Sequence, residues 1–239
     1  ELSDINSPLL QKLSEEAPGT FQHAMQVSNL AAAAANHVRG NAQLVRTGAL
    51  YHDIGKLSNP SFFTENQSGA DSPHKNLDII ESARIIISHV DEGIKMAQKY
   101  GLPPQVQEFI ATHHGHGKAK YFYTTYCNQH PDEEVDESKF TYPGHNPQSK
   151  ETGIMMMADA VEAASRSLKE YNHEAISQLV SRIIDAQISE GLLKDTPLSF
   201  RDVETIKETF TDKLMTIYHT RIAYPTLNAK KDVKAEEKK

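Results

Sequence analysis

Seven histidine and aspartate residues, spread over more than half of the chain, have the types and grouping expected of ligands to two metal ions. Imidazole and carboxylate groups are common ligands of divalent transition metals. The residues are His23, His52, Asp53, His89, His113, His114 and Asp159. Two divalent ions held together can activate water and stabilise a reacting phosphoryl group, so the set predicts metal-assisted hydrolysis of a phosphodiester.

Asp159 is the most informative member of this set. It follows the apolar run 154–158 and precedes Ala160 and Val161. A carboxylate in such surroundings is rarely buried without a cation or metal partner. A position on the solvent side of a helix is the alternative. Arg166 lies about two turns further along the same predicted helical face and would reach Asp159 only through intervening groups.

Each histidine is weak evidence by itself. His23 lies on an apolar helical stripe with Val27 and Leu30, where a hydrogen-bonded core histidine is the alternative to a ligand. The adjacent His52 and Asp53 end another apolar helical segment. The ordered set of His, His-Asp, His, His-His and Asp is far more specific than any of its members.

The spacing of apolar residues predicts helices almost everywhere, and strand-like alternation is nearly absent. The predicted helices cover residues 21–38, 41–54, 77–100 with a break near 91–93, 102–112, 151–171, 174–190 and 200–223. Thr20 suits an N-cap, and Pro103 and Pro104 suit a first turn. The predicted fold class is all-α, a helical bundle with long functional loops.

Two polar segments rich in proline and glycine interrupt the helices, at residues 58–75 and 129–148. Loops of this length in a compact domain are usually functional or disordered. Residues 228–239 are almost entirely charged or small and predict a disordered tail. We therefore expect one domain over residues 1–227, with its core at about 20–220.

Composition excludes several classes of protein. The net charge of -7 is unsuited to holding polymeric nucleic acid. Hydrophobic residues make up 38% of the chain, but no apolar run of the roughly eighteen residues needed to span a bilayer is present. The single Cys127 favours a reducing, intracellular setting. The chain begins with Glu1, and we expect an excised or processed piece.

The sequence His52-Asp53-Ile54-Gly55-Lys56, with His23 upstream and Asp159 downstream, resembles the HD-domain metal-dependent phosphohydrolases, which are all-α. Residues 46–51, 62–67, 142–144 and 147–151 are similar to the cytoplasmic HD domain of the seven-transmembrane HD receptor family of cyclic di-AMP phosphodiesterases. The resemblance covers about residues 20–220. It implies membrane helices and a sensor upstream, and hence the cytoplasmic domain of a cell-membrane protein.

The resemblance also implies how the ligands divide between two divalent metal ions. One ion takes His23, His52, Asp53 and Asp159; the other takes Asp53, His89, His113 and His114, with Asp53 bridging. A carboxylate can bind two ions through its two oxygens. Imidazole and carboxylate ligands suit iron first and manganese second, and the absence of a cysteine set argues against structural zinc.

The implied reaction opens cyclic di-AMP to linear 5′-pApA through a hydroxide shared by the two ions, with Asp53 and Lys56 as catalytic residues. Lys56 would neutralise developing charge; a surface lysine is the alternative. His116 is a possible proton donor, although a solvated loop histidine is the favoured interpretation.

Substrate recognition is predicted less directly. The expected substrate-binding residues are Lys56, Tyr142, Lys150 and Arg166, while the aromatic residues 121–123 supply stacking faces or belong to the core. His113-His114 is followed by Gly115-His116-Gly117-Lys118, which lacks the Gly-Tyr-Pro of the enzymes that cut cyclic di-GMP.

Three alternatives stay open. A mononuclear HD nucleotidase would leave His89, His113 and His114 unexplained. A di-iron HD oxygenase uses a similar ligand set, so only the loop resemblance counts against it. A cyclic-dinucleotide sensor that binds without cutting has no need of a full ligand set. The oligomeric state is not indicated by the sequence.

Overall fold

The computed structural model describes residues 4–69 and 71–219, and within these ranges the chain is helical, as predicted. The α-helices are α1 (Pro8–Glu16), α2 (Pro18–His37), α3 (Ala42–Tyr51), α4 (Ile79–Ile87), α5 (His89–Lys99), α6 (Pro104–Thr112), α7 (Lys120–Gln129), α8 (Lys150–Ser165), α9 (His173–Ser189) and α10 (Phe200–His219). Short 3-10 helices are η1 (Ile54–Ser58), η2 (Pro60–Phe62), η3 (Thr64–Asn66), η4 (Pro73–Asn76) and η5 (Glu137–Phe140). Among the described residues, β-pairing is confined to one bridge between Lys118 and Thr141.

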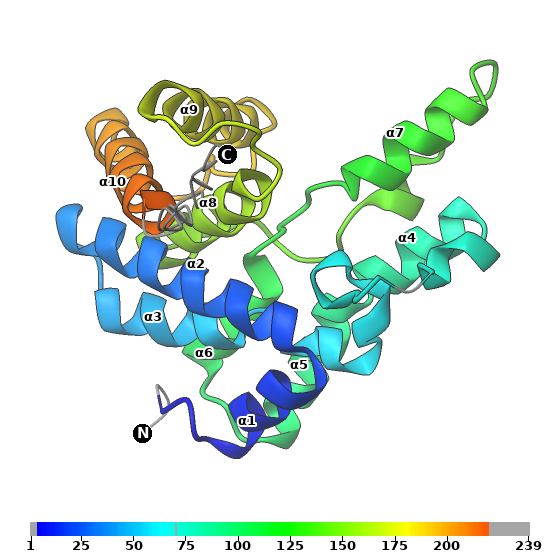
Figure 1. Ribbon diagram of the computed structural model, residues 1–239, viewed down its shortest axis with the longest axis horizontal. Coiled ribbons are helices and arrows are strands. Elements are labelled where there is room, and N and C mark those ends of the chain that lie inside the picture. Colours follow the sequence, from blue (N-terminus) through cyan, green and yellow to red (C-terminus); the bar gives the residue numbers. More distant parts are fainter. Residues whose placement is uncertain (1–3, 70, 220–239) are drawn as a thin grey trace, which may run out of the picture.

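The larger core lies among α2, α3, α8, α9 and α10, which form a bundle (Figure 1). Helix α2 turns the small residues Ala31, Ala34 and Ala35 inward, and all three are fully buried. Small side chains allow close approach of neighbouring helices, so α2 packs against both α3 and α8. This packing brings side chains from α2 and α8 to one site.

A second core joins α1 to the ends of α3, α5 and α6 through residues such as Leu10, Leu50 and Ile110. Gly55 lies at its edge, where η1 touches α5. A Cβ atom on Gly55 would lie 1.7 Å from the carbonyl oxygen of His89, so only glycine permits this contact. The contact fixes the position of the first residue of α5.

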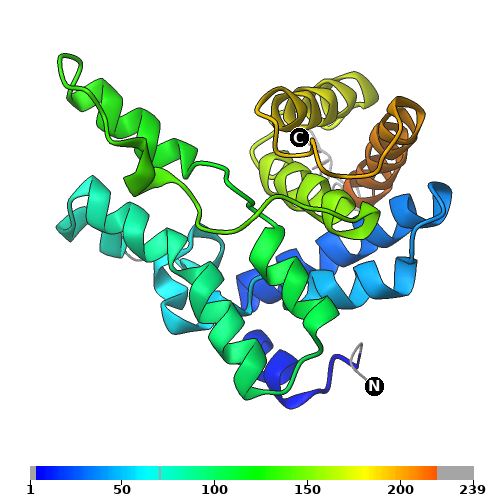
Figure 2. The ribbon, with the colours of Figure 1, turned by 180° about the vertical axis from the view of Figure 1, so that it is seen from behind.

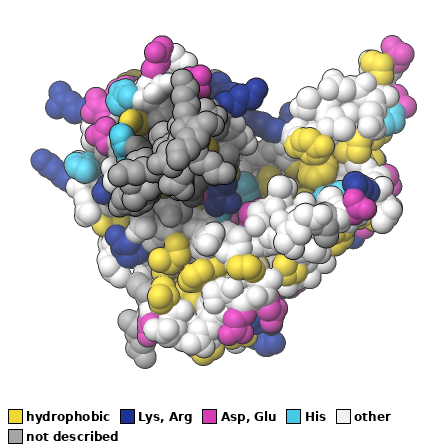
Figure 3. All heavy atoms as spheres, in the orientation of Figure 1, with side chains coloured by type: hydrophobic (Ala, Val, Ile, Leu, Met, Phe, Trp, Pro, Cys, Tyr) yellow, Lys and Arg dark blue, Asp and Glu magenta, His cyan; other side chains and the backbone are white. Residues whose placement is uncertain are grey.

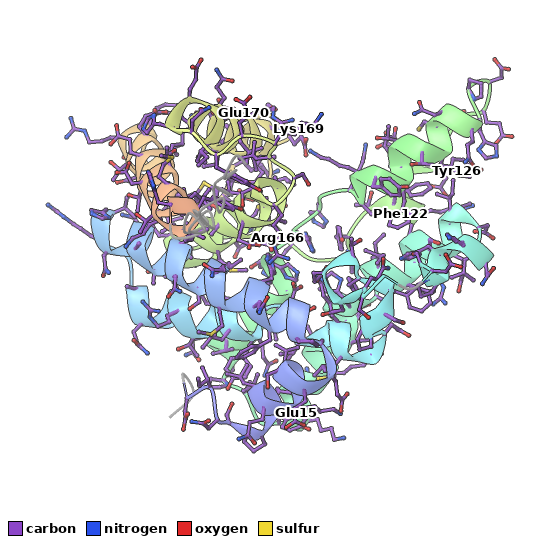
Figure 4. All side chains as sticks on the ribbon, in the orientation of Figure 1. Glu15, Phe122, Tyr126, Arg166, Lys169 and Glu170 are labelled. Atoms are coloured by element: carbon purple, nitrogen blue, oxygen red, sulfur yellow. The ribbon has the colours of Figure 1, made fainter. Side chains whose placement is uncertain are left out.

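Helices α4 and α7 form an arm that projects from the bundle in both views (Figures 1 and 2). Phe122 and Tyr126 point from α7 towards α4 (Figure 4). The Phe122 ring also packs on His74, with ring centroids 5.4 Å apart. Figure 3 shows the surface hollowed between this arm and the bundle.

Most predicted helices are present, with specific differences. The break expected near 91–93 lies at Ser88, because His89 begins α5. Helix α8 ends at Ser165 and not at 171. Helices α1 and α7 were not predicted, and the expected loop at 58–75 contains three of the 3-10 helices. No described helix is both long and apolar enough to cross a membrane. The predicted tail at 228–239 lies outside the described residues, and the single-domain boundary stays a prediction.

Candidate metal centre

Three histidines are supplied by the ends of helices. His52 and His113 follow the last residues of α3 and α6, and His89 stands just after the end of α4. The Nδ1 atom of each donates to the backbone carbonyl three residues earlier, at 2.7, 2.6 and 2.8 Å for His52, His89 and His113. Carbonyls in a final helical turn lack helical partners, so these imidazoles satisfy them. Each ring therefore presents Nε2 to the centre, with its Nδ1 already used in a hydrogen bond.

The carboxylate of Asp53 lies between two groups of ligand atoms. Its Oδ2 lies 3.2 Å from Nε2 of His52 and 3.8 Å from Nε2 of His23. Its Oδ1 lies 3.4 Å from Nε2 of both His89 and His113. Asp53 is fully enclosed, and the two oxygens face different histidines, which is the arrangement that a bridging ligand requires.

The first group joins α2, α3 and α8. His23 comes from the second turn of α2 and Asp159 from α8, and His23 Nε2 lies 2.7 Å from Asp159 Oδ1. His52 Nε2 lies 3.4 Å from the same oxygen. All three side chains are buried. Together with Asp53 they form a four-residue set whose ligand atoms lie within 4.8 Å of one another.

The second group consists of His89, His113 and His114, whose ligand atoms also lie within 4.8 Å of one another. The Nε2 atoms of His89 and His113 are 3.1 Å apart. The His114 ring stacks on Tyr142, with centroids 4.1 Å apart and the planes inclined by 20°. The stack fixes the orientation of the His114 ring.

Two buried atoms at the junction of the groups have no hydrogen-bond partner, His52 Nε2 and Asp53 Oδ1. Leaving buried polar atoms unpaired is costly, and native structures seldom contain them without a ligand, ion or water. A donor set of imidazoles and carboxylates around such atoms fits divalent metal ions. The residues of both groups therefore fit two adjoining ions.

The electrostatics of the two groups differ. Burial disfavours the charged imidazole of His52, but the carboxylates of Asp53 and Asp159 outweigh burial and raise the His52 pKa to about 10. Burial raises the pKa of Asp53 and Asp159, but neighbouring cations hold both pKa values well below the usual range. Burial lowers the pKa of His113 and His114. Imidazoles must be neutral to bind a metal, so burial favours the metal-binding form of His113 and His114, whereas His52 must release a proton.

Lys56 reaches the centre from η1. Its ammonium lies 2.8 Å from Asp53 Oδ2 and 2.7 Å from Glu65 Oε1. Burial opposes the charge on Lys56, but the two carboxylates raise its pKa. Lys56 is therefore a largely enclosed cation held by two carboxylates, and its side chain points to the ligand groups as the sequence predicted. Glu65 was not predicted, because nothing in the loop sequence indicates which of its acids turns inward.

Both ligand groups reach a cavity of about 600 Å³, the first through His23, Asp53 and Asp159 and the second through His113 and His114. Cations and apolar residues from α8 and α9 line the same cavity. Tyr142 and Arg166 line it, as does Lys56. Lys118 and Lys120, which were not predicted, stand at its wall and pair with Glu137 and Glu190.

Two sets of predicted recognition residues lie elsewhere. Lys150 begins α8, at the opposite end from Asp159, and its Nζ donates to the carbonyl of Val38 at 3.1 Å. It caps α2 and is not among the residues that line the cavity, and its expected role in substrate binding stays a prediction. Tyr121 projects into solvent, and the aromatic residues 121–123 are also absent from the cavity wall. His116 is exposed, in agreement with a solvated loop histidine.

The helical fold brings five histidines and two aspartates into two adjoining groups of ligand atoms. This combination is typical of α-helical proteins that bind metal ions. The chain belongs to the HD domain family, whose model matches residues 20–164. This finding confirms the resemblance drawn from His52 and Asp53.

The chain is 42% identical over 230 residues to the cyclic-di-AMP phosphodiesterase PgpH of Bacillus subtilis strain 168, covering 96% of this chain and 32% of that protein. It is 38% identical over 225 residues to PgpH of Listeria monocytogenes serotype 1/2a (strain 10403S), covering 94% and 31%. The chain thus spans about a third of the length of these relatives. The crystal structure of the L. monocytogenes PgpH HD domain in complex with cyclic-di-AMP matches with a TM-score of 0.85 at 37% identity, over 89% of this chain and 99% of that one.

Proposed function

We propose that this chain is a metal-dependent phosphodiesterase that hydrolyses cyclic di-AMP to linear 5′-pApA. One observation carries the proposal: the two ligand groups open onto a single cavity of about 600 Å³ whose wall carries cations. The similarity to an HD domain solved with cyclic-di-AMP supports the choice of substrate.

The cavity matches the chemistry of a cyclic dinucleotide. Its cations are Lys56, Lys118, Lys120 and Arg166, which can meet the charge of two phosphates. Apolar side chains from α8 and α9, including Met156 and Ile183, give surfaces on which a base can pack. A site of this size suits a small molecule, in agreement with the expectation that polymeric nucleic acid is not the substrate.

The ligands of the first ion are proposed to be His23, His52, Asp53 and Asp159, and those of the second Asp53, His89, His113 and His114. Divalent ions held there would polarise a phosphate oxygen and lower the pKa of water. Asp53 keeps the two ligand groups together through its two oxygens. Lys56 adds a positive charge beside Asp53 where negative charge grows on phosphorus. Hydrolysis breaks the bond between phosphorus and the 3′-oxygen, leaving a 5′-phosphate and a 3′-hydroxyl.

We propose iron as the metal and manganese as the second choice. Five imidazoles and two carboxylates suit both metals, and the cysteine of the chain, Cys127 on α7, is not among the ligand groups. Elemental analysis of protein purified without oxygen tests the choice; zinc alone at two ions per chain would contradict it.

The activity test uses protein reconstituted with Fe²⁺ or Mn²⁺, incubated with cyclic di-AMP and followed by chromatography of the linear product. Asp53→Asn should abolish turnover, because it removes the shared ligand, while His37→Ala on the exposed end of α2 should not. Unchanged cyclic di-AMP with both metals present would contradict the proposal. Cyclic di-GMP in a parallel reaction tests selectivity for the base.

We further propose that the chain acts as the cytoplasmic part of a larger membrane receptor. The support is the family resemblance and the relatives' greater length. Fractionation of cells that express the full-length gene product tests it, and recovery of the activity in the soluble fraction alone would contradict it.

A further inference from the structure

His23 is oriented in a different way from the three histidines at helix ends. It lies in the second turn of α2, where the carbonyls of the preceding residues are bonded within the helix. Its Nδ1 is instead hydrogen-bonded to Oε2 of Glu162. For His23, the acceptor of the Nδ1 hydrogen bond is thus a carboxylate on another helix. For His52, His89 and His113 it is a backbone carbonyl in the last turn of a helix.

Glu162 is itself held on its other side. It lies on α8, one turn after Asp159, and is 6% exposed. Its Oε1 accepts from Nε of Arg166 at 3.0 Å and from Nη2 at 2.9 Å. Arg166 lies at the end of α8 beside the hollow between bundle and arm (Figure 4). Arg166, Glu162 and His23 therefore form a continuous chain of hydrogen bonds that ends at the first ligand group.

We propose that Glu162, oriented by Arg166, is a positioning residue that keeps the proton of His23 on Nδ1 and directs Nε2 towards Asp53 and Asp159. A carboxylate acceptor fixes the tautomer and increases the basicity of a ligating histidine. Glu162 therefore sets the metal affinity of the first group and leaves the second group unaffected. The inference rests on the proposed metal centre and is independent of the substrate. It also gives Arg166 a role beside the expected contact with a phosphate, and Glu162 is the intervening group through which Arg166 acts on the first ligand group.

Glu162→Gln is the informative variant. An amide has one acceptor and one donor group, whereas His23 and Arg166 both donate to residue 162. Glutamine therefore cannot satisfy both partners. Binding of Mn²⁺, followed by electron paramagnetic resonance and calorimetry, should show one of the two ions weakened by about 10- to 100-fold. The other should stay close to its original affinity.

Variants in which one of the two ligand groups is disabled identify which ion Glu162 affects. His89→Ala disables the second group and leaves the first, and there the added Glu162→Gln should weaken Mn²⁺ by about 10- to 100-fold. Asp159→Ala disables the first group, and there the same change should have almost no effect. Equal losses in both backgrounds, or no loss in either, would overturn the proposal. Because no substrate is present, this result is separate from any failure of the hydrolysis assay.

A double variant distinguishes positioning from general stability. Arg166→Met with Glu162→Gln removes the competing donor, so the amide oxygen can turn to His23 and recover part of the lost affinity. A purely structural role would make the two losses add. Ser165→Ala is a matched control, since Ser165 is buried on the same helix and bonds to the carbonyl of Glu162 and not to its side chain.

Nitrogen-15 spectra of the Zn²⁺-loaded protein should show the His23 proton on Nδ1 in the wild type; a proton-free Nδ1 would also overturn the proposal.

Discussion

Lys56 and Asp53 form a buried ion pair in which Nζ of the lysine lies 2.8 Å from Oδ2 of the aspartate. This oxygen also faces His52, so the ammonium touches the first ligand group without belonging to it. The lysine belongs to η1, which follows the His-Asp pair, and it stands three positions after Asp53 in the chain.

Replacing Lys56 by Met should separate catalysis from metal binding. We expect kcat to fall by about 100-fold, the usual effect of losing one group that stabilises transition-state charge, while two ions per chain are retained. Steady-state kinetics and metal analysis on the same preparation check this. Lys95→Met, on the exposed face of α5, is the control. Loss of metal in proportion to activity would contradict a catalytic role for Lys56.

The pair of Lys56 and Glu65 predicts a pH-dependent contribution to stability. Burial raises the pKa of the Glu65 carboxyl, but Lys56 outweighs burial and lowers that pKa below its usual 4.5. A lowered folded-state pKa gives stability that is complete above the unfolded value and is lost as pH falls through the folded value. Glu65→Gln should thus cost about 2 kcal/mol at pH 7 and progressively less below pH 4.5.

Urea unfolding of chelator-treated wild type and Glu65→Gln at pH 7, 5, 4 and 3 measures this difference. Lys56 keeps its charge throughout that range because its pKa is raised. A difference in unfolding free energy that stays constant with pH would show that the loss comes from packing and not from the carboxylate charge.

Gly55→Ala should displace the backbone of His89, and through it the second ligand group, although Gly55 is not itself a ligand. The new Cβ would collide with the carbonyl oxygen of His89, 1.7 Å away, and push η1 from the start of α5. We expect a loss of about 1–3 kcal/mol in unfolding free energy and weaker binding of one ion. Chemical denaturation and Mn²⁺ titration measure the two effects. Gly40→Ala is the control, because its nearest neighbours would lie 3.4 Å away. Equal behaviour of the two variants would contradict the prediction.

The ring of Tyr142 should matter more than its hydroxyl. Its stacked ring supports His114 and faces the cavity. Tyr142→Phe should retain the activity, whereas Tyr142→Ala should raise the KM for cyclic di-AMP about tenfold, the value of one aromatic contact. Tyr121→Ala, at a tyrosine that is 75% exposed, should change neither kcat nor KM. A KM raised equally by Tyr142→Phe would place the contribution in the hydroxyl.

The sequence indicated which histidines and aspartates would lie together, because their types are unusual in their surroundings. Asp159 within an apolar helix and His23 on an apolar stripe both signalled polar atoms with partners in the interior, and the structure brings them to 2.7 Å. The structure groups His89, His113 and His114 together and places Asp53 with His23, His52 and Asp159, while Oδ1 of Asp53 lies 3.4 Å from His89 and His113. Their role as metal ligands stays a prediction that metal analysis tests.

The other features of the fold and the site were not predicted, mostly because they depend on contacts between distant segments, which local sequence patterns do not contain. Helix α7 is rich in aromatic residues and threonine, which are weak helix formers, and contacts such as Phe122 with His74 accompany its helical conformation. Glu162 is one of many acids on a predicted helix face, and only the packing of α2 on α8 selects it as the partner of His23. Lys150 belongs to the resembling segment 147–151, but it is the first residue of α8 and bonds to the carbonyl of Val38. Helix α1 had a visible signal in Pro8 and the buried leucines that follow.

The ligand groups also link parts of the chain that are far apart in sequence. His23 and Asp159 are separated by 136 positions, and the segments between them include most of both cores. Metal ions bound to the two ligand groups would act as removable cross-links between these segments. They would resemble disulfides, which this chain cannot form internally because it has one cysteine. Metal supply would then control how cooperatively the whole fold melts, and cells short of metal would hold a looser, more readily degraded form of the protein.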